Sequence, residues 1–135
     1  MKALGIHLDR ERVLKFSNRA IRSIEGKFGG SLLTYFADTN ATFQTDEKGN
    51  PILNELGLPV PVASREMMAR MYSIETVGTL VWGGLLHEHA YTMDEVVDMI
   101  PLSRIMEIAN TVITHVLEEY GTSETVSQNG VMEKQ

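Results

Sequence analysis

The chain has 135 residues, of which 43% are hydrophobic and 22% charged, an ordinary globular composition and a length that suits one domain. It contains no cysteine, which excludes disulfides, thiol nucleophiles and thiolate zinc sites. No apolar run approaches the roughly 18 residues of a membrane-spanning helix, and no signal-peptide pattern opens the chain, so we expect a cytoplasmic protein without a membrane partner. The net charge of −6 disfavours nucleic-acid binding. Basic residues nevertheless concentrate near the N-terminus, at Lys2, Arg10, Arg12, Lys15, Arg19, Arg22 and Lys27.

Residues 4–16 show the alternation of a β-hairpin. Leu4, Ile6 and Leu8 share one face, and Leu14 and Phe16 alternate after a charged turn. The turn lacks an Asn-Gly or Asp-Gly pair, and a lone hairpin is marginally stable, so the hairpin is expected to pack on helices.

Two helices are predicted next. Ser17 is a suitable N-cap for a helix over residues 17–28, and Gly29-Gly30 supplies its end. Residues 31–38 contain enough apolar positions for a second, short helix or for a continuation of the first after a break.

Residues 39–63 differ in composition from the rest of the chain. They hold every proline of the first hundred residues and two turn signals, KGNP and LGLP. We predict a long loop, which is either mobile or an interaction arm, because structureless connections of this length are uncommon in compact domains. No internal repeat is apparent in the chain.

A short helix over residues 64–71 is predicted from the N-cap Ser64. It carries Met67, Met68 and Met71, and methionine clusters are more often core filler than an adaptable binding surface.

The central helix is predicted over residues 73–89, capped by Ser73. Its apolar positions occupy most of the circumference, which indicates burial on several sides. Gly78, Gly83 and Gly84 each lower helix propensity, so they suggest close approach of a neighbouring element. Trp82 is expected to lie in the core, with a role as a partner hot spot as the alternative.

The last elements are a helix over residues 93–100, with Thr92 and Glu95 as a capping box, and a helix over residues 101–120. The latter has an apolar stripe of Leu102, Met106, Ala109, Ile113, Val116 and Tyr120. Residues 121–135 are expected to form a flexible polar tail after a single domain over residues 1–120. The predicted fold class is mainly α, a small N-terminal hairpin packed on a bundle of about five helices, with α+β as the minor alternative.

The strongest candidate for chemistry is the sequence Leu86-His87-Glu88-His89. On a helix, residues i and i+2 point in nearly opposite directions, whereas helical zinc sites use i and i+4, so we do not predict a metal site. His7 and His115 are each expected to be hydrogen-bonded core or boundary residues. No nucleophile elbow, phosphate-binding loop or convergent carboxylate pair is present, and we expect neither an enzyme nor a cofactor.

The order of these segments, a hairpin ending in LKF, then RAIRSIEGKFGGSLL, a variable segment and ETVGTLVWGGLLHEHAYTMDEVVDMI, resembles the tail assembly chaperones of long-tailed phages and prophages. The likeness covers residues 4–120, and its most diagnostic part is Val77 to Ile100. The segment 39–63 is longer than the family pattern.

The resemblance implies a non-enzymatic protein of the host bacterial cytoplasm that is absent from the mature virion. Such chaperones keep the tape measure protein soluble and assist tail tube subunits, and many also occur as a longer frameshifted form. Candidate partner-binding residues are Met67, Met68, Met71, Trp82, Leu86 and Tyr91.

Two other functions remain open. One is a small helical adaptor that binds one folded partner, with the stripe on the last helix as the face of a dimer or other homo-oligomer. A nucleic-acid module that uses the basic N-terminal region is the third possibility.

Overall fold

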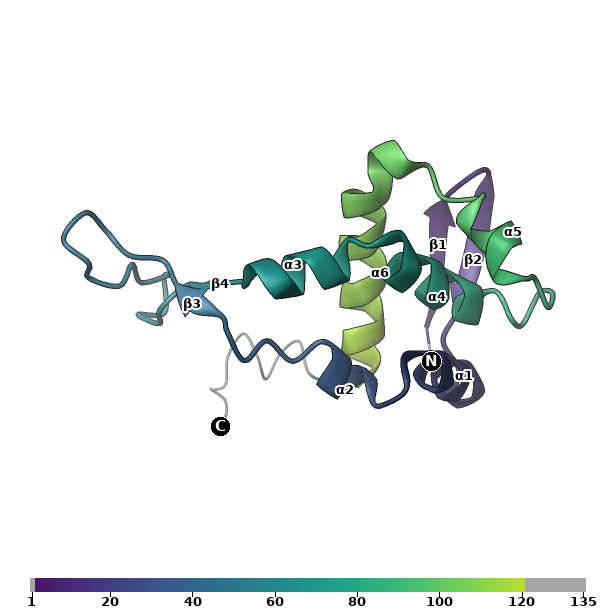
Figure 1. Ribbon diagram of the computed structural model, residues 1–135, viewed down its shortest axis with the longest axis horizontal. Coiled ribbons are helices and arrows are strands. Elements are labelled where there is room, and N and C mark those ends of the chain that lie inside the picture. The colour runs from purple at the N-terminus through teal and green to yellow at the C-terminus, as the bar shows by residue number, and fades with distance from the viewer. Residues whose placement is uncertain (1, 121–135) are drawn as a thin grey trace.

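The computed structural model describes residues 2–120, so the predicted tail at 121–135 lies outside the described residues. The elements in chain order are β1 (Ala3–His7), β2 (Glu11–Lys15), α1 (Asn18–Phe28), α2 (Leu32–Tyr35), β3 (Thr42–Phe43), β4 (Pro61–Val62), α3 (Arg65–Met71), α4 (Ile74–Gly84), α5 (Met93–Val97), the 3-10 helix η1 (Leu102–Arg104) and α6 (Ile105–Glu119). The prediction of a mainly α fold with a small N-terminal hairpin is confirmed (Figure 1).

β1 and β2 form the predicted antiparallel hairpin, with Leu4 opposite Leu14 and Ile6 opposite Arg12. The alternation that predicted it also sets its burial. Ile6, Arg12, Leu14 and Phe16 are buried on the face toward the helices, and the alternate strand residues Gly5, His7, Val13 and Lys15 are exposed.

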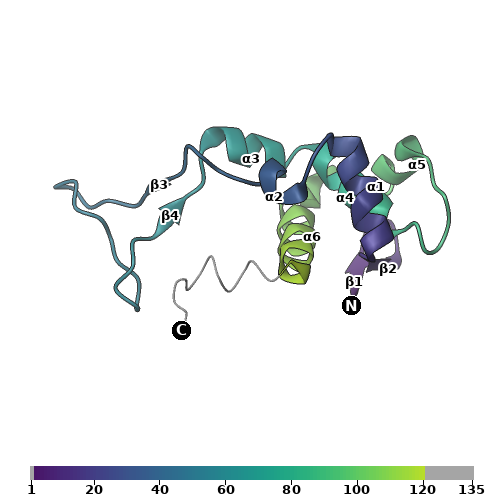
Figure 2. The ribbon, with the colours of Figure 1, turned by 90° about the horizontal axis from the view of Figure 1, so that it is seen from below.

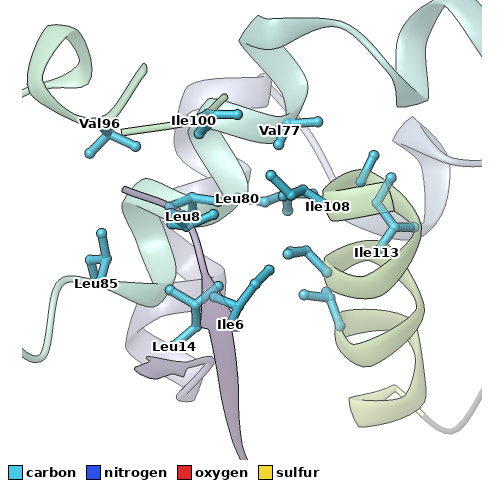
Figure 3. Packing of buried hydrophobic residues seen from close by; sticks show 14 of the residues in the cluster. Ile6, Leu8, Leu14, Val77, Leu80, Leu85, Val96, Ile100, Ile108 and Ile113 are labelled. Atoms are coloured by element: carbon cyan, nitrogen blue, oxygen red, sulfur yellow. The ribbon is translucent and has the colours of Figure 1, made fainter. Parts of the chain in front are cut away.

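Helix α4 is the centre of the fold, as its apolar circumference predicted. It contacts α1, α3, α5, α6 and β2, and every residue from Thr76 to Val81 is buried. Figure 3 shows the shared core, in which side chains from the hairpin, α4, α6 and the segment that contains α5 meet. The labelled members are Ile6, Leu8, Leu14, Val77, Leu80, Leu85, Val96, Ile100, Ile108 and Ile113.

The glycine pair at the end of α4 permits this packing. A Cβ on Gly83 would collide with the side chain of Ile24 in α1, and one on Gly84 would lie 2.8 Å from Cβ of Leu14 in β2. The expectation that these glycines allow close approach is therefore confirmed.

Three predicted helices end earlier than expected. α4 stops at Gly84 rather than residue 89, because the glycine pair has low propensity and the next residues bind the hairpin. α2 ends at Tyr35 rather than 38, and Asp38 instead accepts a hydrogen bond from Ser64, the N-cap of α3. α5 covers only Met93–Val97, behind the predicted capping box of Thr92 and Glu95.

The last predicted helix begins differently from the prediction. Pro101 precedes a single 3-10 turn, η1, and the regular helix α6 starts only at Ile105. A short 3-10 turn at the start of an α-helix is common.

Residues 39–63 form an arm that extends away from the helices (Figures 1 and 2). The predicted long loop contains short strand pairing that was not predicted. β3 pairs with β4, and two further bridges join Thr45 to Pro51 and Leu53 to Pro59. The sequence signal for this pairing is local. Each bridge encloses a turn, and a side chain of that turn, Asp46 or Asn54, accepts backbone N–H groups within it.

The arm contains two copies of one turn, so the statement that the chain lacks an internal repeat is wrong. QTDEKGNP (44–51) and ILNELGLP (52–59) align without a gap. In the first unit Asp46 Oδ1 accepts the backbone N–H groups of Lys48 and Asn50, at 2.9 Å each. In the second, Asn54 Oδ1 accepts those of Leu56 and Leu58, at 2.8 and 3.1 Å.

The two turns share their backbone as well. Gly49 and Gly57 have φ of 85° and 78°, the left-handed conformation that glycine adopts without strain. Three backbone hydrogen bonds join the segments on either side of the two turns. The N–H of Gln44 donates to the carbonyl of Val60, that of Val60 to Ile52, and that of Ile52 to Gln44, at 2.9 to 3.2 Å.

Candidate interaction surfaces

The base of the arm is clasped by Asp38. Its carboxylate accepts the backbone N–H of Ser64 at 2.8 Å and the hydroxyl of Ser64 at 2.7 Å. The same hydroxyl caps α3 by accepting the N–H of Met67. These bonds to Ser64 lower the pKa of Asp38 below its ordinary value of 3.8. One carboxylate therefore joins the two ends of the arm and orients α3.

An apolar hollow of about 370 Å³ lies beside this clasp, and we call it the base pocket. α3, α6 and both ends of the arm contribute to it. Its lining is Phe36, Asp38, Ala41, Pro61, Val62, Ala63, Met67, Met71, Ile113 and Leu117.

The arm exposes an unusual amount of apolar side chain. Half of the large hydrophobic side chains that are exposed in the described residues belong to it, namely Phe43, Ile52, Leu53, Leu56, Leu58 and Val62. Leu56 is 70% exposed. Large apolar side chains that gather on one exposed segment often mark an interaction site.

A second group of side chains joins the hairpin turn to the segment after α4. Arg12 is only 7% exposed, and its guanidinium donates to both carboxylate oxygens of Asp9, at 2.8 and 3.0 Å. It also donates to the hydroxyl of Tyr91, at 3.3 Å, and to Glu88, at 3.4 Å. Tyr91 in turn donates to Glu88 at 2.8 Å. The ion pair with Arg12 lowers the pKa of Asp9.

The His87-Glu88-His89 sequence is used for this attachment. His87 Nε2 donates to the carbonyl of Val13 at 2.8 Å, and the ring of His89 packs edge-on against Tyr91. Within residues 2–120 no group of three or more His, Cys, Asp or Glu side chains could hold a metal ion. His87 therefore links the segment after α4 to the hairpin.

The other two histidines each have a hydrogen-bond partner. His115 is half-buried and donates from Nε2 to the carbonyl of Lys2 at 3.0 Å, as a boundary residue would. His7 is exposed and pairs with Glu11 at 2.8 Å.

The six candidate partner-binding residues do not form one surface. Met67 and Met71 line the base pocket, whereas Met68, the third methionine of α3, is 44% exposed. Trp82 is half-buried, and its indole N–H donates to the carbonyl of Tyr91 at 3.1 Å. Leu86 lines a different hollow, beside the start of α1.

The apolar stripe of α6 belongs mainly to the core. Ala109, Ile113 and Val116 are buried, so the stripe as a whole does not provide a dimer face. Leu102 and Met106, at its beginning, remain 71% and 53% exposed.

Sequence reasoning missed the polar residues that fix these surfaces. Arg12 had a detectable signal, because it shares its strand face with Leu14 and Phe16, which were predicted to be buried. Glu25 accepts the N–H of Leu32 at 2.9 Å and the hydroxyl of Tyr120 at 2.8 Å, and thereby ties α1, α2 and the end of α6 together. Its partners are distant in sequence, and no local pattern reveals them.

Comparisons with protein-family models, with curated proteins and with solved structures find no significant match to this chain. No helix within residues 2–120 is long and apolar enough to cross a membrane.

Proposed function

We propose that the chain is a phage tail assembly chaperone, which keeps the tape measure protein soluble and assists recruitment of tail tube subunits. The protein would act in the host bacterial cytoplasm and be absent from the finished virion. It would work by binding, without catalysis.

The observation that carries the proposal is the position of the resemblance in the fold. The most diagnostic segment, residues 77–100, coincides with the packing centre. Gly83 and Gly84 admit α1 and β2, Trp82 binds the carbonyl of Tyr91, and Glu95 completes a capping box. Likeness in residues that determine packing supports a shared fold, and the function must be argued from exposed side chains as well.

The body also exposes apolar side chains that a client could contact. Leu102, in η1, and Met106, in the first turn of α6, are both exposed, at 71% and 53%. An apolar patch of this kind suits a partner whose own apolar stripe would otherwise aggregate.

The test is purification of the tagged chain from prophage-induced cells, with the co-purifying proteins identified by mass spectrometry. Tape measure or tail tube protein should be recovered, and the variant L102S/M106S should recover less of it while keeping its helical circular dichroism. Recovery of neither protein, with a different folded partner in stoichiometric amount, would refute the chaperone role and favour the adaptor function.

A further inference from the structure

The two units of the arm share a backbone but differ in polarity. At four aligned positions the first unit has Gln44, Thr45, Lys48 and Asn50, and the second has Ile52, Leu53, Leu56 and Leu58. The first unit forms the turn with polar side chains, so the turn does not require apolar ones. The second unit's side chains are each more than 40% exposed, so they do not stabilise the arm by burial either. Their chemistry indicates a surface that another molecule covers.

The size of the arm fits an interface. Every residue of 39–63 is exposed except Val60, and a ribbon of strands without a layer packed on it is marginally stable in water. Its 25 residues match the roughly 20–30 residues that each partner contributes to a standard protein interface.

The chain itself carries the complementary hollow. The base pocket is lined mainly by apolar side chains, and none of its lining residues comes from the second unit. A charged residue lies near the second turn, and another lies near the base pocket. Glu55 precedes Leu56 in the turn, and Arg65 follows the pocket residue Ala63 by two positions. Arg65 is exposed and makes no ion pair with any residue in the described part of the chain.

We propose that the covering molecule is a second copy of this chain. The second turn of each arm (54–58) packs into the base pocket of the other copy, and Glu55 faces the partner's Arg65. A twofold axis makes the exchange reciprocal, so both turns and both pockets are used and the assembly closes as a dimer. The inference concerns self-association and does not depend on the chaperone function.

The first test is the mass of the full chain in solution over a concentration series, by light scattering during size exclusion. The wild type should be a dimer. The variant I52Q/L53T/L56K/L58N gives the second unit the side chains of the first, and it should be a monomer with unchanged helical circular dichroism. The matched control K48A/N50A, in the first turn, should remain a dimer. A wild type that is monomeric throughout, or a dimer that survives the conversion, would overturn the proposal.

The second test uses the absence of cysteine in the chain. A mixture of chains carrying Leu56→Cys and Ala63→Cys should form an intermolecular disulfide under mild oxidation. A mixture of Lys48→Cys and Ala63→Cys chains should form far less. Equal cross-linking in the two mixtures would contradict the assigned contact. If instead the wild type is a monomer and conversion of the turn abolishes capture of tape measure protein, a client rather than a second copy covers the arm, and the proposal is wrong.

Discussion

At Gly83 a single hydrogen in place of a methyl group determines how closely α1 approaches α4. Gly83→Ala improves helix propensity by up to about 1 kcal/mol, but its Cβ would collide with Ile24. Overpacking of a core typically costs about 1–3 kcal/mol, so we expect a net loss of stability in urea unfolding.

The matched control is Gly26→Ala, in α1. A Cβ there meets no atom within 4 Å, so the same change of residue should stabilise the protein, by up to about 1 kcal/mol. If both substitutions stabilise the fold, the close packing of α1 on α4 is not as described.

Tyr120 predicts how stability changes at high pH. Burial, followed by its hydrogen bond to Glu25, raises the pKa of Tyr120 from 10 to about 12. A group with a raised native pKa contributes stability that is complete below its unfolded pKa and is lost as pH rises through the native one. The free energy of unfolding should therefore decline between pH 10 and 12, and Tyr120→Phe should reduce the decline. Equal slopes for the two proteins would contradict this role.

At the scale of elements, the Asp38 clasp should control the arm without affecting the body. Asp38→Ala removes both bonds to Ser64, so amide hydrogen exchange should accelerate at Ser64 and in β3 and β4, with little change in the core of α4. Thr39→Ala, an exposed neighbour, is the control. Since the native pKa of Asp38 is lowered, the clasp should be complete above pH 3.8 and be lost as the pH falls below it.

Elements with strong periodicity were predictable, and ends set by tertiary contacts were not. The alternation of residues 4–16 and the apolar circumference of residues 74–81 each correspond to one local structure. The end of α4 depends on His87 reaching a carbonyl in β2, 74 residues earlier, which no local pattern encodes.

The pairing within the arm was missed for a different reason. Its two units have the same turn chemistry but opposite polarity, so a search for repeated hydrophobic positions does not find them. The repeat is visible only in the shared Asp or Asn, glycine and proline positions, which are the residues that determine a turn. Helix spacing alone also cannot tell that Met67 and Met71 line a pocket while Met68 is exposed.

At the scale of the whole molecule, charge and apolar exposure are both unevenly distributed. Residues 2–30 carry seven Lys and Arg against three Asp and Glu, and the rest of the chain carries five against 15, which gives +4 and −10 and sums to the net −6. Apolar side chains are exposed on the arm and at Leu102 and Met106, and the net negative charge opposes aggregation through them.

The most direct test of the proposed function is co-expression with the tape measure protein of the same phage or prophage, followed by sedimentation of the lysate. We predict that the tape measure protein pellets when expressed alone and stays in the supernatant with the wild-type chain, and that L102S/M106S protects it less. A tape measure protein that sediments equally with and without the chain would contradict the account.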